Sequence, residues 1–160
     1  MNRDYNNSYG VRLLISKILI GYDGTDCSNR ALDFGLELAQ KYSASVLIIN
    51  VLEMPVYTNP EEPLAVSAGM SGLAKDLREA HKATLAEASA KAARDWPNVS
   101  VTTKLLEGNP SAQIVEESSE GNFDVVIVGH GSQSRLQELF LGGTSERVAH
   151  RSRCTVIIVK

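Results

Sequence analysis

The residues best suited to chemistry lie in one glycine-rich stretch near the C-terminus. Gly129 and Gly131 follow the apolar run of residues 125–128, and a second cluster of small residues, Gly-Gly-Thr-Ser, occupies positions 142–145. Bare backbone N–H groups and the N-terminus of a helix together form a favourable environment for an anion. We therefore expect this stretch to bind an anion, with phosphate as the leading candidate. The alternative is that these glycines only make turns.

The loop between the two clusters offers few side chains that could act on a bound phosphate. His130, Gln133 and Arg135 are the candidates, whereas efficient turnover needs a base or a water-positioning residue beside the phosphates. We therefore expect turnover of a bound phosphate compound to be slow or absent. The His130 side chain could contact a ligand or simply face solvent.

Polar residues mark the starts of the helices on either side of this expected site. Asp23 ends the first apolar segment, residues 18–23. It could orient a ribose, hold Mg²⁺ through water, or act as a turn aspartate that caps its own helix. Thr144 or Ser145 is expected to cap a helix that begins around Glu146.

Apolar spacing and turn signals predict five strands that alternate with four helices. Strands are expected near residues 18–23, 46–51, 99–106, 125–128 and 155–159, and helices near 26–42, 72–96, 110–121 and 145–150. This alternation predicts a doubly wound α/β fold with three layers, in which a parallel sheet carries helices on both faces. Ligands bind such sheets outside the carboxyl ends of the strands, where the strand order reverses. The turn at Asp23 and the loop at Gly129 are expected to meet there.

The sequence also gives specific expectations for several helical and loop residues. The first helix should bury a face made of Ala31, Phe34, Leu38, Ala39 and Tyr42. Residues 52–70 contain several prolines and should form a loop that is either disordered or a lid. His81 is expected to be solvated on its helix, and His150 to interact with the dipole at a helix end.

Composition indicates one domain and excludes some classes of partner. Within the 160 residues, 1–16 should be a flexible tail and 17–160 a single domain. A net charge of −3 argues against nucleic acid and anionic membranes as partners. Cys27 and Cys154 lack metal-ligand spacing and are expected to be free thiols. No segment is long and apolar enough to span a bilayer, so we expect a cytoplasmic protein.

Four segments then occur in a familiar order and spacing. They are Ile18-Leu-Ile-Gly-Tyr-Asp-Gly-Thr25 with Ser28, Gly108-Asn-Pro110, Val126-Ile-Val-Gly-His-Gly131, and Leu141-Gly-Gly-Thr-Ser-Glu-Arg-Val148 before Cys154-Thr-Val-Ile-Ile-Val159. On these segments the chain from Lys17 onward resembles the universal stress protein family. The resemblance implies a Rossmann-like, adenine-nucleotide-binding fold with strand order 3-2-1-4-5. It also implies a homodimer formed through the last strand.

The resemblance also assigns roles to individual residues. Gly21 and Asp23 would lie by the ribose and base, and Val51 would contact adenine. The phosphates would be wrapped by Gly129, His130, Gly131, Ser132, Gln133, Ser134 and Arg135, and closed over by Gly142, Gly143, Thr144 and Ser145. The implied cofactor is ATP or another adenine nucleotide, possibly with Mg²⁺.

The glycine loop departs from the ATP signature of the family, which is Gly-x-x-Gly, nine residues, then Gly-Ser or Gly-Thr. Aligned without gaps, Gly129 matches the first glycine, Ser132 stands at the second, and Gly143 stands at the hydroxyl position. A shift of one residue would instead give Gly131 the role of the second glycine.

Three classes of function therefore remain open at this stage. The leading one is a nucleotide-binding regulatory module in the stress response, whose occupancy changes its choice of an unidentified protein partner. The others are a weak ATP hydrolase or nucleotidyl transferase, and a nucleotide-free dimeric interaction protein.

Overall fold

The computed structural model describes residues 15–53, 64–130 and 143–160, with the helix backbone alone over residues 64–71. Strands and helices alternate along these residues. They are β1 (Lys17–Gly21), α1 (Asp26–Tyr42), β2 (Ser45–Leu52), α2 (Leu64–Asp95), β3 (Val101–Glu107), α3 (Pro110–Glu120), β4 (Val125–Gly129), α4 (Thr144–Arg151) and β5 (Thr155–Val159).

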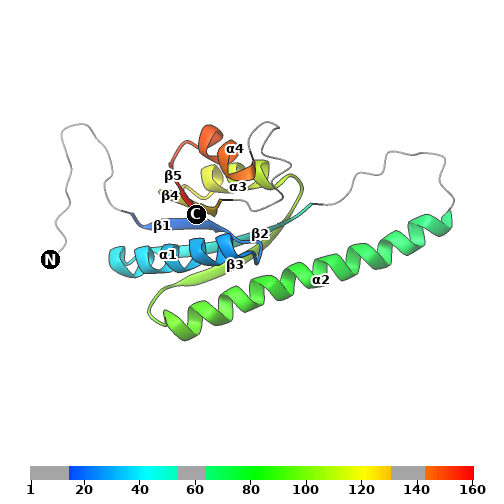
Figure 1. The fold of residues 1–160 in the computed structure, drawn as a ribbon, viewed down its shortest axis with the longest axis horizontal. Helices are drawn as coiled ribbons and strands as arrows, with labels where there is room; N and C mark the ends of the chain where they lie inside the picture. The colour runs from blue at the N-terminus through cyan, green and yellow to red at the C-terminus, as the bar shows by residue number, and fades with distance from the viewer. Residues whose placement is uncertain (1–14, 54–63, 131–142) are drawn as a thin grey trace.

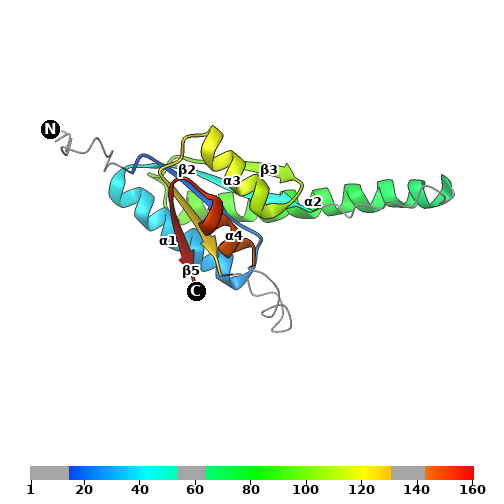
Figure 2. The same cartoon turned by 90° about the horizontal axis from the view of Figure 1, so that it is seen from above.

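All four strand pairings are parallel, and the strand order is β3-β2-β1-β4-β5. The predicted doubly wound α/β fold and its strand order are therefore confirmed. Helices α1 and α2 cover one face of the sheet, and α3 and α4 cover the other (Figure 1). Viewed from above, α4 lies over the side of the sheet that contains β4 and β5, whereas α3 lies over β2 and β3 (Figure 2).

Each face of the sheet has its own apolar cluster, because successive side chains of a strand point to opposite faces. Ile18 and Ile20 of β1 pack with α1 and α2, while Leu19 packs with Ile114 of α3 and Val148 of α4. All three β1 side chains are fully buried. Strand β1 is thus covered on both sides, as the continuous apolar run predicted.

Of the face that we expected α1 to bury, Ala31 and Ala39 are buried and Leu38 is half-buried, but Phe34 and Tyr42 are not. Phe34 and Tyr42 are each 41% exposed, and the buried residues are Ser28, Ala31, Leu32, Gly35, Leu36 and Ala39. The reason is a close approach at Gly35, where an added Cβ would lie 2.5 Å from Ile20 Cδ1 and 3.2 Å from Ile127 Cδ1. The side of α1 that approaches the sheet is therefore the one that contains Gly35, where no larger residue would fit.

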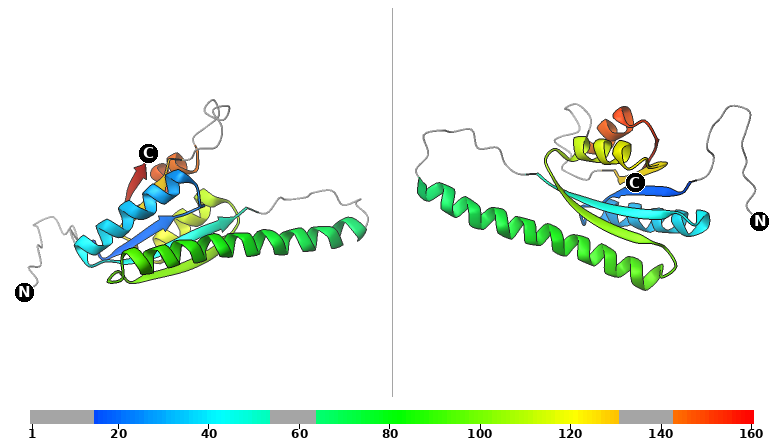
Figure 3. Two further views of the ribbon diagram at one scale, coloured as in Figure 1. Left: turned by 60° about the horizontal axis from the view of Figure 1, so that its bottom comes forward. Right: turned by 180° about the vertical axis from the view of Figure 1, so that it is seen from behind.

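Helix α2 begins earlier than expected, at Leu64, so residues 64–70 are helical rather than part of a loop. Pro63 precedes the first helical residue, which suits a helix start because proline is tolerated there. The helix packs on the sheet near its C-terminal end through Leu85, Ala88 and Ala92, all buried. Its N-terminal part extends beyond the sheet (Figure 3).

The predicted start of α3 is confirmed in detail. Asn109 is the N-cap and accepts a hydrogen bond from Ala112 N at 3.1 Å, and Pro110 is the first helical residue. Among the helices that the structure describes, none has the length and hydropathy needed to cross a lipid bilayer.

Candidate functional site

The crevice predicted by the topology lies at the carboxyl ends of β1 and β4. These strands are neighbours, with Gly21 of β1 paired to Val128 of β4. From β1 the chain builds outward to β2 and β3, then crosses back to β4 and β5 on the other side. The strand order therefore reverses between β1 and β4, which is where doubly wound sheets bind ligands.

The structure brings the described candidate residues to this one edge. Gly21 and Gly129 end β1 and β4, Val51 lies one residue before the end of β2, and Asp23 lies in the turn after β1. Gly143, Thr144 and Ser145 lie at the start of α4, which begins at the same edge because it connects β4 to the parallel β5. The other candidates, Gly131, Ser132, Gln133, Ser134, Arg135 and Gly142, lie outside the described residues.

Packing at position 129 requires a glycine, which its place in the sequence did not reveal. An added Cβ would lie 2.6 Å from the carbonyl carbon of Cys27 and 2.8 Å from Ser28 N. Since Cys27 and Ser28 belong to the first turn of α1, any side chain at Gly129 would force α1 away from β4. This glycine serves a close backbone approach rather than a turn alone.

Gly143, unlike Gly129, is not required by packing within the residues that the structure describes. Its φ is −58°, and an added Cβ would meet none of the described atoms within 4 Å. The described part of the chain therefore gives no packing or conformational reason for a glycine here.

Asp23 organises the turn between β1 and α1. Its Oδ1 accepts hydrogen bonds from Thr25 N at 3.0 Å and Thr25 Oγ1 at 2.6 Å. Thr25 in turn is the N-cap of α1, and its Oγ1 accepts from Ser28 N at 3.3 Å. Asp23 therefore positions the capping residue instead of capping α1 itself. Gly24 permits the turn with a φ of +82°.

The same hydrogen bonds keep Asp23 ionised. Desolvation of the carboxylate opposes ionisation, but the hydrogen bonds from the Thr25 side chain and backbone outweigh it, so the pKa of Asp23 is lowered. Hydrogen bonding by Ser28 acts in the same direction. A negatively charged carboxylate therefore lies at the carboxyl edge of the sheet.

Helix α4 begins without a side-chain cap, which corrects our expectation for Thr144 and Ser145. Its N-cap is Gly143, its first residue is Thr144, and Gly143 O accepts the first intrahelical bond from Arg147 N at 3.1 Å. Ser145 is buried because, three residues before Val148, it lies on the side of α4 that faces the sheet. The N–H groups of residues 144–146 precede the first intrahelical bond and have no acceptor within the helix.

A polar contact at the end of β2 was missed by sequence reasoning. Asn50 is 3% exposed, and its Oδ1 lies 2.5 Å from Nδ1 of His81 on α2. The expectation that His81 is solvated was therefore wrong: it is half-buried and hydrogen-bonded. The available signal was Asn50 itself, a polar residue within an otherwise apolar strand, because a buried amide needs a partner.

Helix α2 also closes one side of the β1–α1 turn. Thr84 Cγ2 lies 3.2 Å from the position of a Cβ on Gly24.

His130 and His150 both have exposed side chains. The backbone N–H of His130 donates a hydrogen bond to Val159 O at 2.7 Å. A ligand role for His130 stays a prediction.

The fold and the glycine-lined crevice define a doubly wound α/β protein whose strand-order reversal lies beside an uncapped helix N-terminus. The family model of the universal stress protein family matches residues 15–160. The chain belongs to that family.

Individual relatives agree with this assignment. Universal stress protein MJ0531 of Methanocaldococcus jannaschii is 29% identical over 147 residues, covering 92% of this chain and 83% of the relative. Universal stress protein YxiE of Bacillus subtilis is 28% identical over 150 residues, covering 92% of this chain and all of the relative, 100%.

Solved structures show the same fold at lower identity. Universal stress protein UspA from Lactobacillus plantarum has a TM-score of 0.74 and 20% identity, covering 91% of this chain and 98% of that one. A universal stress protein in complex with cAMP has a TM-score of 0.69 and 23% identity, covering 92% and 98%. One from Archaeoglobus fulgidus in complex with dAMP has a TM-score of 0.61 and 19% identity, covering 92% and 100%.

Proposed function

We propose that this chain is a regulatory module of the stress response that binds ATP or another adenine nucleotide at the β1–β4 crevice. The observation that carries the proposal is the meeting of three features at one sheet edge. They are the Asp23 turn, the end of β2 at Val51, and the uncapped start of α4 after Gly143. Nucleotide occupancy would change how the protein interacts with other proteins.

Each feature suits one part of a nucleotide. The N–H groups of residues 144–146, which have no acceptor within α4, suit phosphate oxygens, because hydrogen bonding and the helix dipole act in the same direction there. The ionised Asp23 suits a ribose hydroxyl as a hydrogen-bond acceptor. Val51 is half-buried and offers apolar contact to a base.

Relatives support this class of ligand. The solved family structures include complexes with cAMP and dAMP, described above, and one from Arabidopsis thaliana with AMP bound. Because few fixed cations line the expected phosphate loop, ATP affinity should be modest. Mg²⁺ should then matter chiefly as a counterion held by the phosphates themselves.

Isothermal titration calorimetry with ATP, ADP, AMP and cAMP tests the proposal. We expect modest affinity for at least one of them, and Gly142→Val should abolish the heat of binding by placing a side chain against the phosphates. Gly131→Val is expected to interfere similarly. No heat with any of these ligands at millimolar concentration would contradict the proposal.

The choice of control glycine follows from the structure. Gly121 is unsuitable, because an added Cβ there would clash with the ring of Phe123. Gly129 is equally unsuitable because of its approach to Cys27. Gly72→Val is a better control, since a Cβ at Gly72 meets none of the described atoms within 4 Å.

The second candidate function is a nucleotide-free dimeric interaction protein. It is favoured by the departures from the ATP signature, Ser132 and Gly143. If the ungapped alignment is right, Ser132→Gly should strengthen nucleotide binding. A wild-type protein without detectable binding that gains it as Ser132→Gly with Gly143→Ser would assign the chain to this second function.

A further inference from the structure

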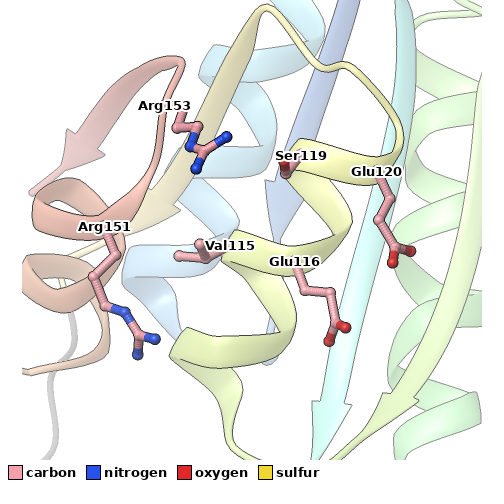
Figure 4. A pocket seen from close by; sticks show the side chains of 6 residues that line it. All are labelled: Val115, Glu116, Ser119, Glu120, Arg151 and Arg153. Carbon is pink, nitrogen blue, oxygen red and sulfur yellow. The ribbon is translucent and has the colours of Figure 1, made fainter.

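A groove separates α3 from the end of α4 on the face of the sheet opposite α1 and α2. It has a volume of about 420 Å³ and is lined by Val115, Glu116, Ser119, Glu120, Arg151 and Arg153 (Figure 4). Both helices run from the carboxyl edge of the sheet to its amino edge, and the groove is near their C-terminal ends. It is therefore distinct from the β1–β4 crevice.

The two walls of the groove carry opposite charges. Arg151 ends α4 and Arg153 lies in the connection to β5, while Glu116 and Glu120 extend from α3 (Figure 4). No ion pair within 4.0 Å joins these walls in the described part of the chain. The apolar side chain of Val115, which is half-buried, lies between them.

The two arginines differ from the other arginines whose contacts the structure records. Arg78 pairs with Glu107, and Arg94 pairs with Asp95. Arg151 and Arg153 have no hydrogen-bond or ion-pair partner among the described residues. Arg151 lies at the C-terminus of α4, where the helix dipole favours a cation, but this interaction does not use the hydrogen-bond donors of its guanidinium group. Such planar donors bind carboxylates with two hydrogen bonds.

The lining also restricts the class of ligand. A dense polyanion, such as a nucleic-acid backbone or polyphosphate, would bring negative charge against Glu116 and Glu120. An extended peptide avoids this cost, because side chains of both signs and an apolar side chain can follow one another along it. Its acidic group would meet the arginines, and its basic group the glutamates.

We propose that the α3–α4 groove is a docking surface for an extended segment of a partner protein, in which an acidic, an apolar and a basic side chain occur close together. Arg151 and Arg153 bind the acidic side chain, and Val115 contacts the apolar one. Glu116 and Glu120 bind the basic side chain. The groove gives this protein a recognition surface that does not depend on the nucleotide site.

Selection from a phage library of random heptapeptides tests the proposal. Full-length protein is the target, and the variant Arg151→Glu with Arg153→Glu is used for counter-selection. We expect wild-type-specific peptides that combine an acidic with a basic residue. In an NMR titration, the best peptide should shift the amide signals of residues 115–120 and 151–154.

Matched variants sharpen the result. Arg153→Glu should weaken binding of the selected peptide about tenfold or more, whereas Arg94→Glu, on the opposite face, should not change it. Retained AMP binding in Arg153→Glu would separate this surface from the nucleotide site. Absence of wild-type-specific peptides, shifts elsewhere, or tighter binding of pyrophosphate than of peptide would overturn the proposal. If the double variant dissociates from dimer to monomer and no peptide is selected, the proposal is also overturned, because the groove then serves self-association.

Discussion

Asp23 and Thr25 show how one residue pair can set both local stability and charge at the site. Thr25 caps α1 and donates to Asp23 Oδ1, so the pair couples the helix start to the ionisation of the carboxylate. Because the pKa of Asp23 is lowered, its contribution to stability is present above the unfolded pKa of about 3.9. That contribution is lost as the pH falls through the lower folded pKa.

An NMR titration of the Asp23 carboxyl group should therefore give a midpoint below the unfolded value of about 3.9. Thr25→Val removes the hydroxyl donor and the cap, so it should move the midpoint upward and cost about 0.5–2 kcal/mol of unfolding free energy. Thr25→Ser keeps the hydroxyl and serves as the control. An unchanged midpoint in Thr25→Val would show that the pair does not set the charge.

At the scale of the element, Gly35 lets α1 lie directly on β1 and β4. Gly35→Ala would place a Cβ 2.5 Å from Ile20 Cδ1, and overpacking of this kind costs about 1–3 kcal/mol. Urea unfolding should record this loss. The matched change Gly72→Ala lies on an exposed part of α2, where alanine should instead stabilise the helix by about 0.5–1 kcal/mol. Equal effects at both positions would contradict the close-approach explanation.

The elements themselves were largely predictable, whereas their contacts were not. Apolar runs and the Asn109-Pro110 turn predicted the strands and the start of α3, because these signals are local in sequence. The buried face of α1, the Asn50–His81 contact and the requirement for glycine at Gly129 depend on segments that meet only in the folded chain. Sequence reasoning located the carboxyl edge of the site but could not supply these long-range partners.

For the whole molecule, β5 ends the sheet, and none of the described residues pairs with its outer edge. Its four apolar residues, Val156 to Val159, are only half-buried. On α1, Phe34 is 41% exposed, and Arg30 Nε donates to Lys160 O at 2.9 Å beside this edge. We predict a homodimer in which two β5 strands pair.

Light scattering at micromolar concentration should report about twice 17.3 kDa. Val156→Asp and Ile158→Lys should each shift the protein toward the monomer, because a charge would be buried between paired edges. Thr103→Lys, on the opposite edge strand β3, should leave the mass unchanged. A clean wild-type monomer, or a dimer insensitive to both charges, would contradict the prediction.

The strand order also determines when the protein can finish folding during synthesis. Strand β1 is made well before β4, which is one of its two neighbours in the sheet, and Ile18 pairs with Val125. Until residues 125–129 have left the ribosome, that side of β1 is an open, apolar edge. The nascent chain therefore passes through a long period in which its central strand is exposed to aggregation. A chain truncated before Val125 should aggregate or bind chaperones where the full chain does not.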